Sequence, residues 1–168
     1  MNVQTQISTA YQDEIPNYRS EDDFITTITT ARPQVRVMNP NSSWFKELEG
    51  RFNELTSLPR GWDGYNGIPV SFSCALFAGN LIERLCVNSL PAPQLVPMSD
   101  GTIRLEWHMN QFDIEVDVLG IYDVFACRTD LLSDEEDEIE VQMDFTELSN
   151  WISELATDRI GALAQVGG

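Results

Sequence analysis

Residues 103 to 118 alternate between apolar and polar side chains almost without a break, and this pattern limits the fold more than any other part of the chain. In TIRLEWHM, the apolar Ile103, Leu105 and Trp107 fall on one face of an extended strand. In QFDIEVDVL, Phe112 and Ile114 begin the same alternation. A period of two is typical of strands with one buried and one solvated face, and the short connection predicts an antiparallel pair.

Two further segments extend this predicted sheet. IYDVFACRT (121–129) follows a turn at Gly120, and IEVQMDF (139–145), with Asp144 directed outward, follows the acidic run SDEEDE. Consecutive strands with short connections predict a meander of about four strands.

Apolar residues at helical spacing mark three other segments. The first follows the serine pair of NPNSSW and ends before Pro59, and the second runs from Ser71 to about Asn88. The third is an amphipathic stretch over residues 146–160. We therefore expect an α+β fold, with two N-terminal helices packed on an antiparallel sheet of about four strands and a C-terminal helix.

The length of 168 residues fits one domain with one core. We expect residues 1–40 to form a flexible or loosely docked arm, because they are mostly polar and lack a sustained period. Within this arm, FITTITT (24–30) and QVRVM (34–38) are rich in β-branched residues and are candidate strands. Residues 41–168 are then expected to form a single α+β domain.

The charge of the chain excludes one class of function. There are 27 acidic and 10 basic residues, a net charge of −17, and no basic stripe. Direct binding of nucleic acid needs such a stripe to neutralise phosphates, so the expected partner is a basic protein surface. The sequence has no long apolar stretch and no signal-peptide pattern at its start, so we expect a cytoplasmic protein without membrane contact. The oligomeric state stays open.

The sequence contains no recognisable catalytic or metal-binding motif. The three cysteines have neither CxxC spacing nor a histidine pattern, which predicts reduced thiols without a disulfide framework or zinc site. The single histidine, His108, lies on the polar side of a predicted strand beside Glu106. We interpret it as a surface residue, and we expect neither an enzyme nor a bound cofactor or metal.

The stretch GWDGYNGIP joins the first two predicted helices and raises the question of a ligand-binding loop. Its glycines permit positive φ, its proline fixes the exit of a turn, and its aromatic side chains can fill a gap between helices and sheet. We interpret it as a structural corner formed by Gly61, Trp62, Asp63, Gly64, Tyr65, Gly67 and Pro69. The alternative is a small-molecule cleft lined by Asp63 and Tyr65.

Residues 58–128 resemble a family of small bacterial and mobile-element proteins. The resemblance is carried by the corner, of the form GWD-x-Y-x-G-x-P, by DGTIRLEW, of the form dG-x-x-x-LEW, and by FDIEV. It implies a similar fold and a mobile-element setting, and it supplies no catalytic residue. In size and charge the chain is also similar, as a class, to phage-encoded anti-CRISPR proteins.

Carboxylates crowd the predicted outward positions of the sheet. Between residues 100 and 147 the chain has 15 acidic residues and two basic ones. Like charges directly opposite one another destabilise a sheet by about 0.2–1 kcal/mol per pair, so folding alone gives no reason for this concentration. One explanation is solubility. The other is mimicry of phosphates, since carboxylates repeat along one strand face at about 6.6–7 Å.

The leading hypothesis is an acidic inhibitor that occupies a basic nucleic-acid-binding surface of a partner, as an anti-CRISPR or other anti-defence protein would. The expected partner-binding residues are Glu106, Asp113, Glu115, Asp117, Asp123, Asp134, Glu135, Glu136, Asp137, Glu138 and Glu140. Two alternatives stay open. One is an antitoxin, immunity-type or assembly partner that binds through an apolar helix face containing Trp151 and Ile152. The other is a small-ligand module or enzyme centred on His108 and Asp63.

Overall fold

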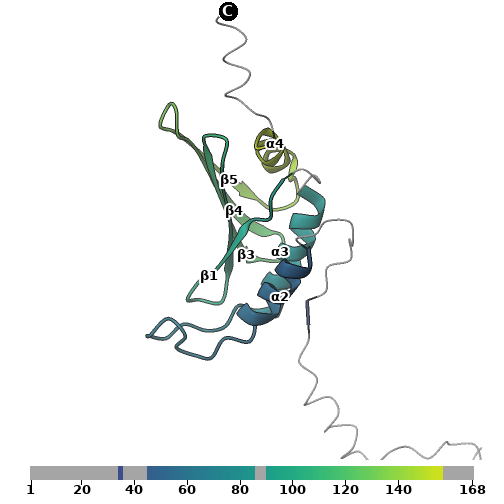
Figure 1. Ribbon diagram of the computed structural model, residues 1–168, viewed down its shortest axis with the longest axis vertical. Helices are drawn as coiled ribbons and strands as arrows, with labels where there is room; N and C mark the ends of the chain where they lie inside the picture. Colours follow the sequence, from purple (N-terminus) through teal and green to yellow (C-terminus); the bar gives the residue numbers. More distant parts are fainter. Residues whose placement is uncertain (1–33, 36–44, 86–89, 157–168) are drawn as a thin grey trace, which may run out of the picture. The chain divides into compact units, whose positions relative to one another are not determined.

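Five consecutive strands form one antiparallel sheet in the computed structural model of the chain (Figure 1). The structure describes residues 34–35, 45–85 and 90–156. In chain order the strands are β1 (Gln94–Pro97), β2 (Ile103–Met109), β3 (Phe112–Gly120), β4 (Asp123–Asp130) and β5 (Glu135–Val141). The order across the sheet is the same, so each strand pairs with its neighbours in sequence and β1 and β5 are the edges.

A tight turn between β2 and β3 fixes the register at the centre of the sheet. Asn110 and Gln111 both have positive φ, 51° and 69°, as expected for a two-residue hairpin turn, and Met109 pairs with Phe112 across it. Because side chains alternate along each strand, this register directs the buried residues of β2 and β3 to a single face.

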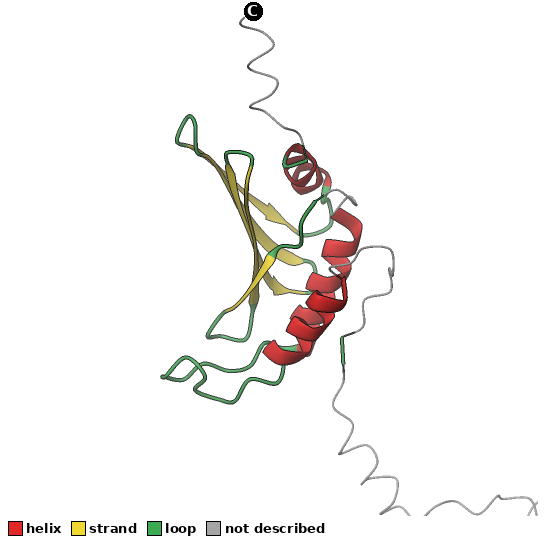
Figure 2. Cartoon of the chain, viewed as in Figure 1, coloured by secondary structure: helices red, strands yellow, loops and turns green. Residues whose placement is uncertain are grey.

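The three helices of the described residues lie on one side of the sheet (Figure 2). They are α2 (Phe45–Leu55), α3 (Phe72–Leu85) and α4 (Thr146–Glu154). Helix α3 packs on β2 and β3, α2 contacts β1, and α4 contacts α3. No described helix covers the opposite face of the sheet, which we call the outer face.

The hydrophobic core fills the space between the helices and the inner face of the sheet. Phe52 of α2, Ile82 of α3 and Ile114 of β3 have at most 1% of their surface exposed. Gly79 of α3 faces Phe52, and a Cβ built at Gly79 would lie 3.8 Å from that ring, an ordinary van der Waals contact. Every residue buried in the described part of this core is apolar, so burial of apolar surface is the main source of its stability.

Val35, which precedes α2 in the sequence, is also part of this core. It is buried, and its backbone N–H donates to Asn53 Oδ1 at 3.0 Å while its carbonyl accepts from Asn53 Nδ2 at 3.3 Å. The described residues from Gln34 onward belong to one compact unit. The packed unit therefore includes part of the expected arm. The rest of residues 1–40, including the candidate strand 24–30, lies outside the described residues.

The α+β class is confirmed, but the described residues form five strands and two of them differ from the prediction. The segment QLVP was expected to lead into a turn, yet it forms β1, because backbone pairing with β2 compensates for its short length and its proline. Strand β5 begins at Glu135 and ends at Val141, whereas the sequence suggested residues 139–145. The acidic run is thus largely strand and not a loop.

The helix bounds also differ from the prediction in detail. Neither helix before the sheet lies at the N-terminus, since α2 begins only at Phe45. Ser71 does cap α3 as expected, with the Cys74 N–H donating to Ser71 Oγ at 3.2 Å. Helix α4 ends at Glu154 and is shorter than residues 146–160. None of the described helices has both the length and the apolar character needed to cross a membrane.

Candidate functional site

Side chains of the outer face form regular rows across the sheet. The central row contains Gln94, Glu106, Glu115, Cys127 and Glu138. One flanking row contains Val96, Arg104, Asp117, Phe125 and Glu140, and the other contains His108, Asp113, Thr129 and Glu136. Seven of the eleven acids predicted from the sequence therefore share this face.

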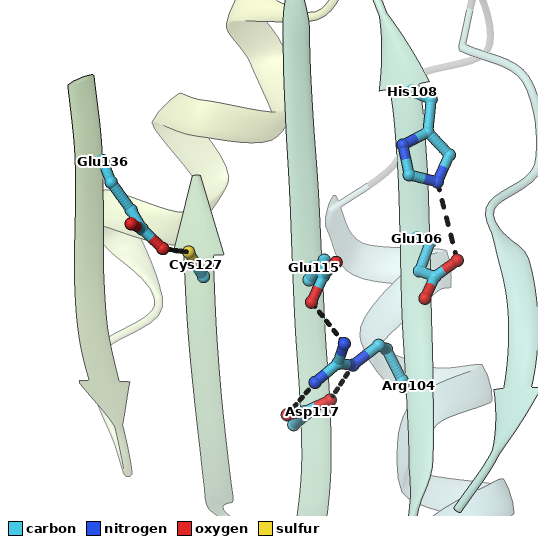
Figure 3. A network of polar contacts seen from close by, with 7 residues as sticks. All are labelled: Arg104, Glu106, His108, Glu115, Asp117, Cys127 and Glu136. Carbon is cyan, nitrogen blue, oxygen red and sulfur yellow. Dashed lines mark hydrogen bonds and ion pairs between the residues drawn. The ribbon is translucent and has the colours of Figure 1, made fainter. Parts of the chain in front are cut away.

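Arg104 of β2 neutralises part of this face. Its guanidinium makes a two-pronged contact with Asp117 of β3, with Nε to Oδ1 at 2.6 Å and Nη2 to Oδ2 at 2.9 Å, and its Nη1 also donates to Glu115 (Figure 3). The hydrogen bond that Arg104 donates to Asp117 is the largest cause of the raised pKa of Arg104. The two β3 carboxylates share one permanent cation, so their mutual repulsion is reduced.

His108 lies between two further carboxylates of the same face. Its Nδ1 is 2.9 Å from Asp113 Oδ1 across the strand pair. Its Nε2 is 3.5 Å from Glu106 Oε2 on the same strand, and Figure 3 shows this second contact. The hydrogen bond to Asp113, followed by the charge of that group and the contact with Glu106, raises the pKa of His108. Half of its side chain is exposed, and it acts as a second, pH-dependent counterion.

The outer-face carboxylates of β5 have no such counterion among the described residues. Among the described residues, Glu136, Glu138 and Glu140 form no ion pair, and all three are exposed. Glu136 accepts a hydrogen bond from the Cys127 thiol at 3.1 Å (Figure 3). The negative charge of the outer face is therefore least compensated along its β5 edge.

The pKa of Cys127 is shifted by this negative environment. Desolvation, the hydrogen bond to Glu136 and the charges of Glu136, Glu138 and Glu115 together raise the pKa of the Cys127 thiol to about 11. Sγ and the carboxylates of Glu136 and Glu138 lie within 4.8 Å of one another, a spacing at which they could hold a metal ion. The raised pKa opposes the thiolate form that a metal would need.

Arg128 binds acids on the inner side of the same strands. It contacts Asp137 of β5 at 2.6 Å and Glu154 of α4 at 2.7 Å, and its guanidinium lies over the ring of Trp151 at 4.9 Å. Asp137 thus points away from the outer face and has its own cation. Alternation explains this difference from the sequence prediction, since neighbouring residues of an acidic run on a strand face opposite sides.

The three remaining acids of the eleven also lie away from the rows, and so does Asp144. Glu135 shares the side of Asp137 and pairs with Asp130 in register, and Asp134 occupies the β4–β5 turn with φ 56°. Asp123 is exposed where β4 starts, beside the β3–β4 turn. Asp144 follows β5 and accepts the Thr146 N–H at 2.9 Å, so it lies in the connection that leads into α4 and does not project from a strand.

The outer face has a strong negative excess despite its cations. Its rows contain seven carboxylates and one guanidinium, an excess of six negative charges when His108 is neutral. The expectation of a fully uncompensated array is wrong for β3, where Arg104 and His108 provide counterions. It holds for the three glutamates of β5.

The GWDGYNGIP segment is a loop that is closed by hydrogen bonds between its own residues. Asp63 Oδ1 accepts the N–H groups of Tyr65 and Gly67, both at 2.9 Å, and these bonds lower the pKa of Asp63. The Gly61 N–H donates to the Gly67 carbonyl at 2.7 Å, and Trp62 Nε1 donates to the Ile68 carbonyl at 2.9 Å. The Asp63 carboxylate is therefore already engaged within the loop.

Backbone bonds tie this loop to the β1–β2 turn. The Ile68 N–H donates to the Ser99 carbonyl and the Ser71 N–H to the Gly101 carbonyl, at 2.9 and 2.8 Å. Tyr65 is 86% exposed, so the expectation that it fills a gap between helices and sheet is wrong. The positions of Gly61 and Gly64, with φ of 77° and 84°, agree with the turn chemistry inferred from the sequence.

Neither alternative site assembles as the sequence suggested. The corner joins the sheet near the start of β2, whereas His108 lies five residues further along that strand, about 16–17 Å away at the usual strand rise. His108 and Asp63 therefore do not form one centre. Trp151 and Ile152 are buried in the core, with 4% and 0% exposed, and cannot present an apolar face to a partner.

Comparison with known proteins identifies no relative: no family model, curated protein or solved structure matches the chain. The resemblance of residues 58–128 to mobile-element proteins therefore stays an expectation. The geometry of the outer face is the observation on which a function can be proposed.

Proposed function

We propose that the outer face binds a cation-rich surface of a partner protein in place of nucleic acid, and so inhibits that partner. The observation that carries this proposal is the row of Glu136, Glu138 and Glu140 on β5, which is exposed and has no counterion among the described residues. A partner that supplies lysine or arginine side chains would relieve the repulsion that the fold leaves in place.

The spacing of the carboxylates supports mimicry of a phosphate backbone. Along β5 the three glutamates repeat at about 6.6–7 Å, and a second line of acids on β3, formed by Asp113, Glu115 and Asp117, runs about 10 Å away, two strand spacings across the sheet. Two parallel lines of negative charge on a rigid sheet present an extended strip that a basic groove can accommodate. A net charge of −17 would also speed the encounter with such a groove.

The competing explanation is that the charge serves only solubility and protects the β5 edge from pairing with other strands. That explanation needs no partner and no particular arrangement of the acids. The resemblance to mobile-element proteins favours a cytoplasmic target in host defence or DNA processing, so the proposed protein is an anti-defence inhibitor and not an enzyme.

Capture of partners with two matched variants tests the proposal. The first variant replaces Glu136, Glu138 and Glu140 with glutamine on the outer face. The second replaces Glu47, Glu49 and Glu147 with glutamine on the helix side, and both change the net charge from −17 to −14. The proposal predicts that only the outer-face variant loses the nucleic-acid-binding proteins captured by wild type at low salt.

The salt dependence of partner capture distinguishes electrostatic binding from apolar binding. Binding through the outer face should weaken steeply between about 50 and 300 mM salt, because exposed charges are screened over a Debye length of about 10 Å at 0.1 M. If the two variants recover the same proteins with the same salt tolerance, the outer face does not bind a partner and only the solubility explanation remains.

A further inference from the structure

A cavity away from the outer face lies between α3, the β3–β4 turn and the residue that precedes α4. Its volume is about 180 Å³. The apolar part of its lining consists of Phe77, Leu81 and Leu85 from α3, Tyr122 from the turn, and Phe145. The cavity is concave and mostly apolar with a few polar groups, as small-molecule pockets are, but it is smaller than the roughly 300–1,000 Å³ typical of them.

Aromatic side chains form the walls of this cavity. The rings of Phe77 and Tyr122 meet edge to face with centroids 5.4 Å apart, and the Phe145 ring lies 6.3 Å from that of Phe77. Tyr122 has φ 58°, a conformation that non-glycine residues rarely adopt. More than half of its surface is exposed, and its place in the two-residue β3–β4 turn accounts for the positive φ.

Arg84 gives the cavity a selective polar group. It is exposed, it lines the cavity together with the exposed Asn80, and it makes no ion pair within the described part of the chain. Arg51, Arg104 and Arg128 by contrast all bind carboxylates. Arg84 lies in the last turn of α3, where the helix dipole favours a positive charge. This interaction leaves the hydrogen-bond donors of its guanidinium available to a ligand.

We propose that this cavity binds a small amphiphilic carboxylate, with a ring or short alkyl chain among Phe77, Tyr122 and Phe145 and the carboxylate on Arg84. Asn80 can donate a second hydrogen bond to the same group. The strongly negative chain repels anions in general, so the affinity depends on the local contact with Arg84 together with burial of the apolar body. The site is independent of the outer face.

Fluorescence titration with anilinonaphthalene sulfonate tests this site in the intact protein, because the probe joins an apolar ring system to an anion. The neutral analogue phenylnaphthylamine is the matched ligand without charge. We expect saturable binding of one sulfonate per chain, displacement by decanoate, and binding of the neutral probe at least tenfold weaker. Binding of several probes per chain, or equal affinity for both probes, would contradict the proposal.

Three variants locate the site. Arg84→Gln should weaken sulfonate binding at least tenfold and leave the neutral probe unchanged. Arg60→Gln removes another exposed arginine that has no ion pair among the described residues, and it should change neither. Asn80→Trp places bulk at an exposed position of the lining and should abolish binding of both probes. Equal sulfonate affinity in the Arg84 and Arg60 variants would overturn the assignment, and thermal melting checks that each variant is folded.

Discussion

Arg104 is the residue that allows acids to lie side by side on the central strands. It has 27% of its side chain exposed, contacts Asp117 and Glu115 at once, and leaves β5 as the uncompensated edge. Such residues determine which part of the outer face keeps unpaired negative charge that a cationic partner can bind.

Replacing Arg104 with glutamine should lower the free energy of unfolding by about 1–2 kcal/mol, because two carboxylates lose charge-assisted hydrogen bonds in a partly exposed site. Urea denaturation measures this change. Arg60→Gln, at an exposed position without an ion pair among the described residues, is the control and should stay within about 0.5 kcal/mol of wild type. Equal stability of the two variants would show that the Arg104 contacts contribute nothing.

His108 should make stability depend on pH near neutrality. Because contact with Asp113 and Glu106 raises its folded pKa above the ordinary 6.5, its contribution is fully present below pH 6.5 and is lost as pH rises through the folded pKa. The difference in unfolding free energy between wild type and His108→Gln should therefore shrink from pH 6 to pH 8.5.

Proton NMR gives the matching direct measurement. His108 is the only histidine of the chain, so its ring signal needs no assignment by mutation. The titration midpoint should lie above 6.5 in the folded protein and fall in Asp113→Asn. A midpoint at or below 6.5 in wild type would mean that Asp113 does not stabilise the imidazolium.

Replacing Gly67 with alanine should destabilise the fold, whereas the same replacement at Gly50 should stabilise it. A Cβ at Gly67 would lie 2.7 Å from Asp63 Cγ, which the loop's hydrogen bonds hold in place. Gly67→Ala should therefore lower the unfolding free energy by about 1–3 kcal/mol. Gly50→Ala, inside α2 with nothing within 4 Å, should raise it by about 0.5–1 kcal/mol. Denaturant unfolding distinguishes these signs, and a Gly67→Ala variant as stable as wild type would contradict the close contact.

At the scale of elements, periodicity predicted the strands that alternate and missed those that depend on their neighbours. β2 and β3 have a buried residue at every second position, so the sequence shows them directly. β1 is short and contains Pro97, and β5 is mostly acidic, so neither has the composition of a strand. Both exist because an adjacent strand offers backbone hydrogen bonds, which local sequence does not reveal.

The β4–β5 pair offers its own probe in Cys127. With its pKa raised to about 11, this thiol should react with iodoacetamide at pH 8 on the order of tenfold more slowly than in the unfolded chain. Replacing Glu136 and Glu138 with glutamine should speed the reaction, because a hydrogen bond and two negative charges are removed. Peptide mass spectrometry measures the extent of alkylation at Cys127 specifically. A rate equal to that of the unfolded chain, and insensitive to these replacements, would contradict a negative environment at Cys127.

At the scale of the whole molecule, composition predicted the negative charge but not its distribution. The sequence placed Glu106, Asp113 and Glu115 correctly, because alternation fixes the side on which they lie. It could not show that Arg104 and His108 face these acids, since cross-strand register is a property of the folded sheet. The aromatic cavity was missed for the same reason: Phe77, Tyr122 and Phe145 are far apart in sequence.

Competition between the protein and nucleic acid for one captured partner tests most directly whether the outer face replaces nucleic acid. The partner is saturated with labelled duplex DNA or RNA, and release of the label is followed as this protein is added. We predict complete displacement by wild type and by the helix-side variant, and little by the variant lacking the charges of Glu136, Glu138 and Glu140. A stable ternary complex of partner, nucleic acid and protein would contradict mimicry.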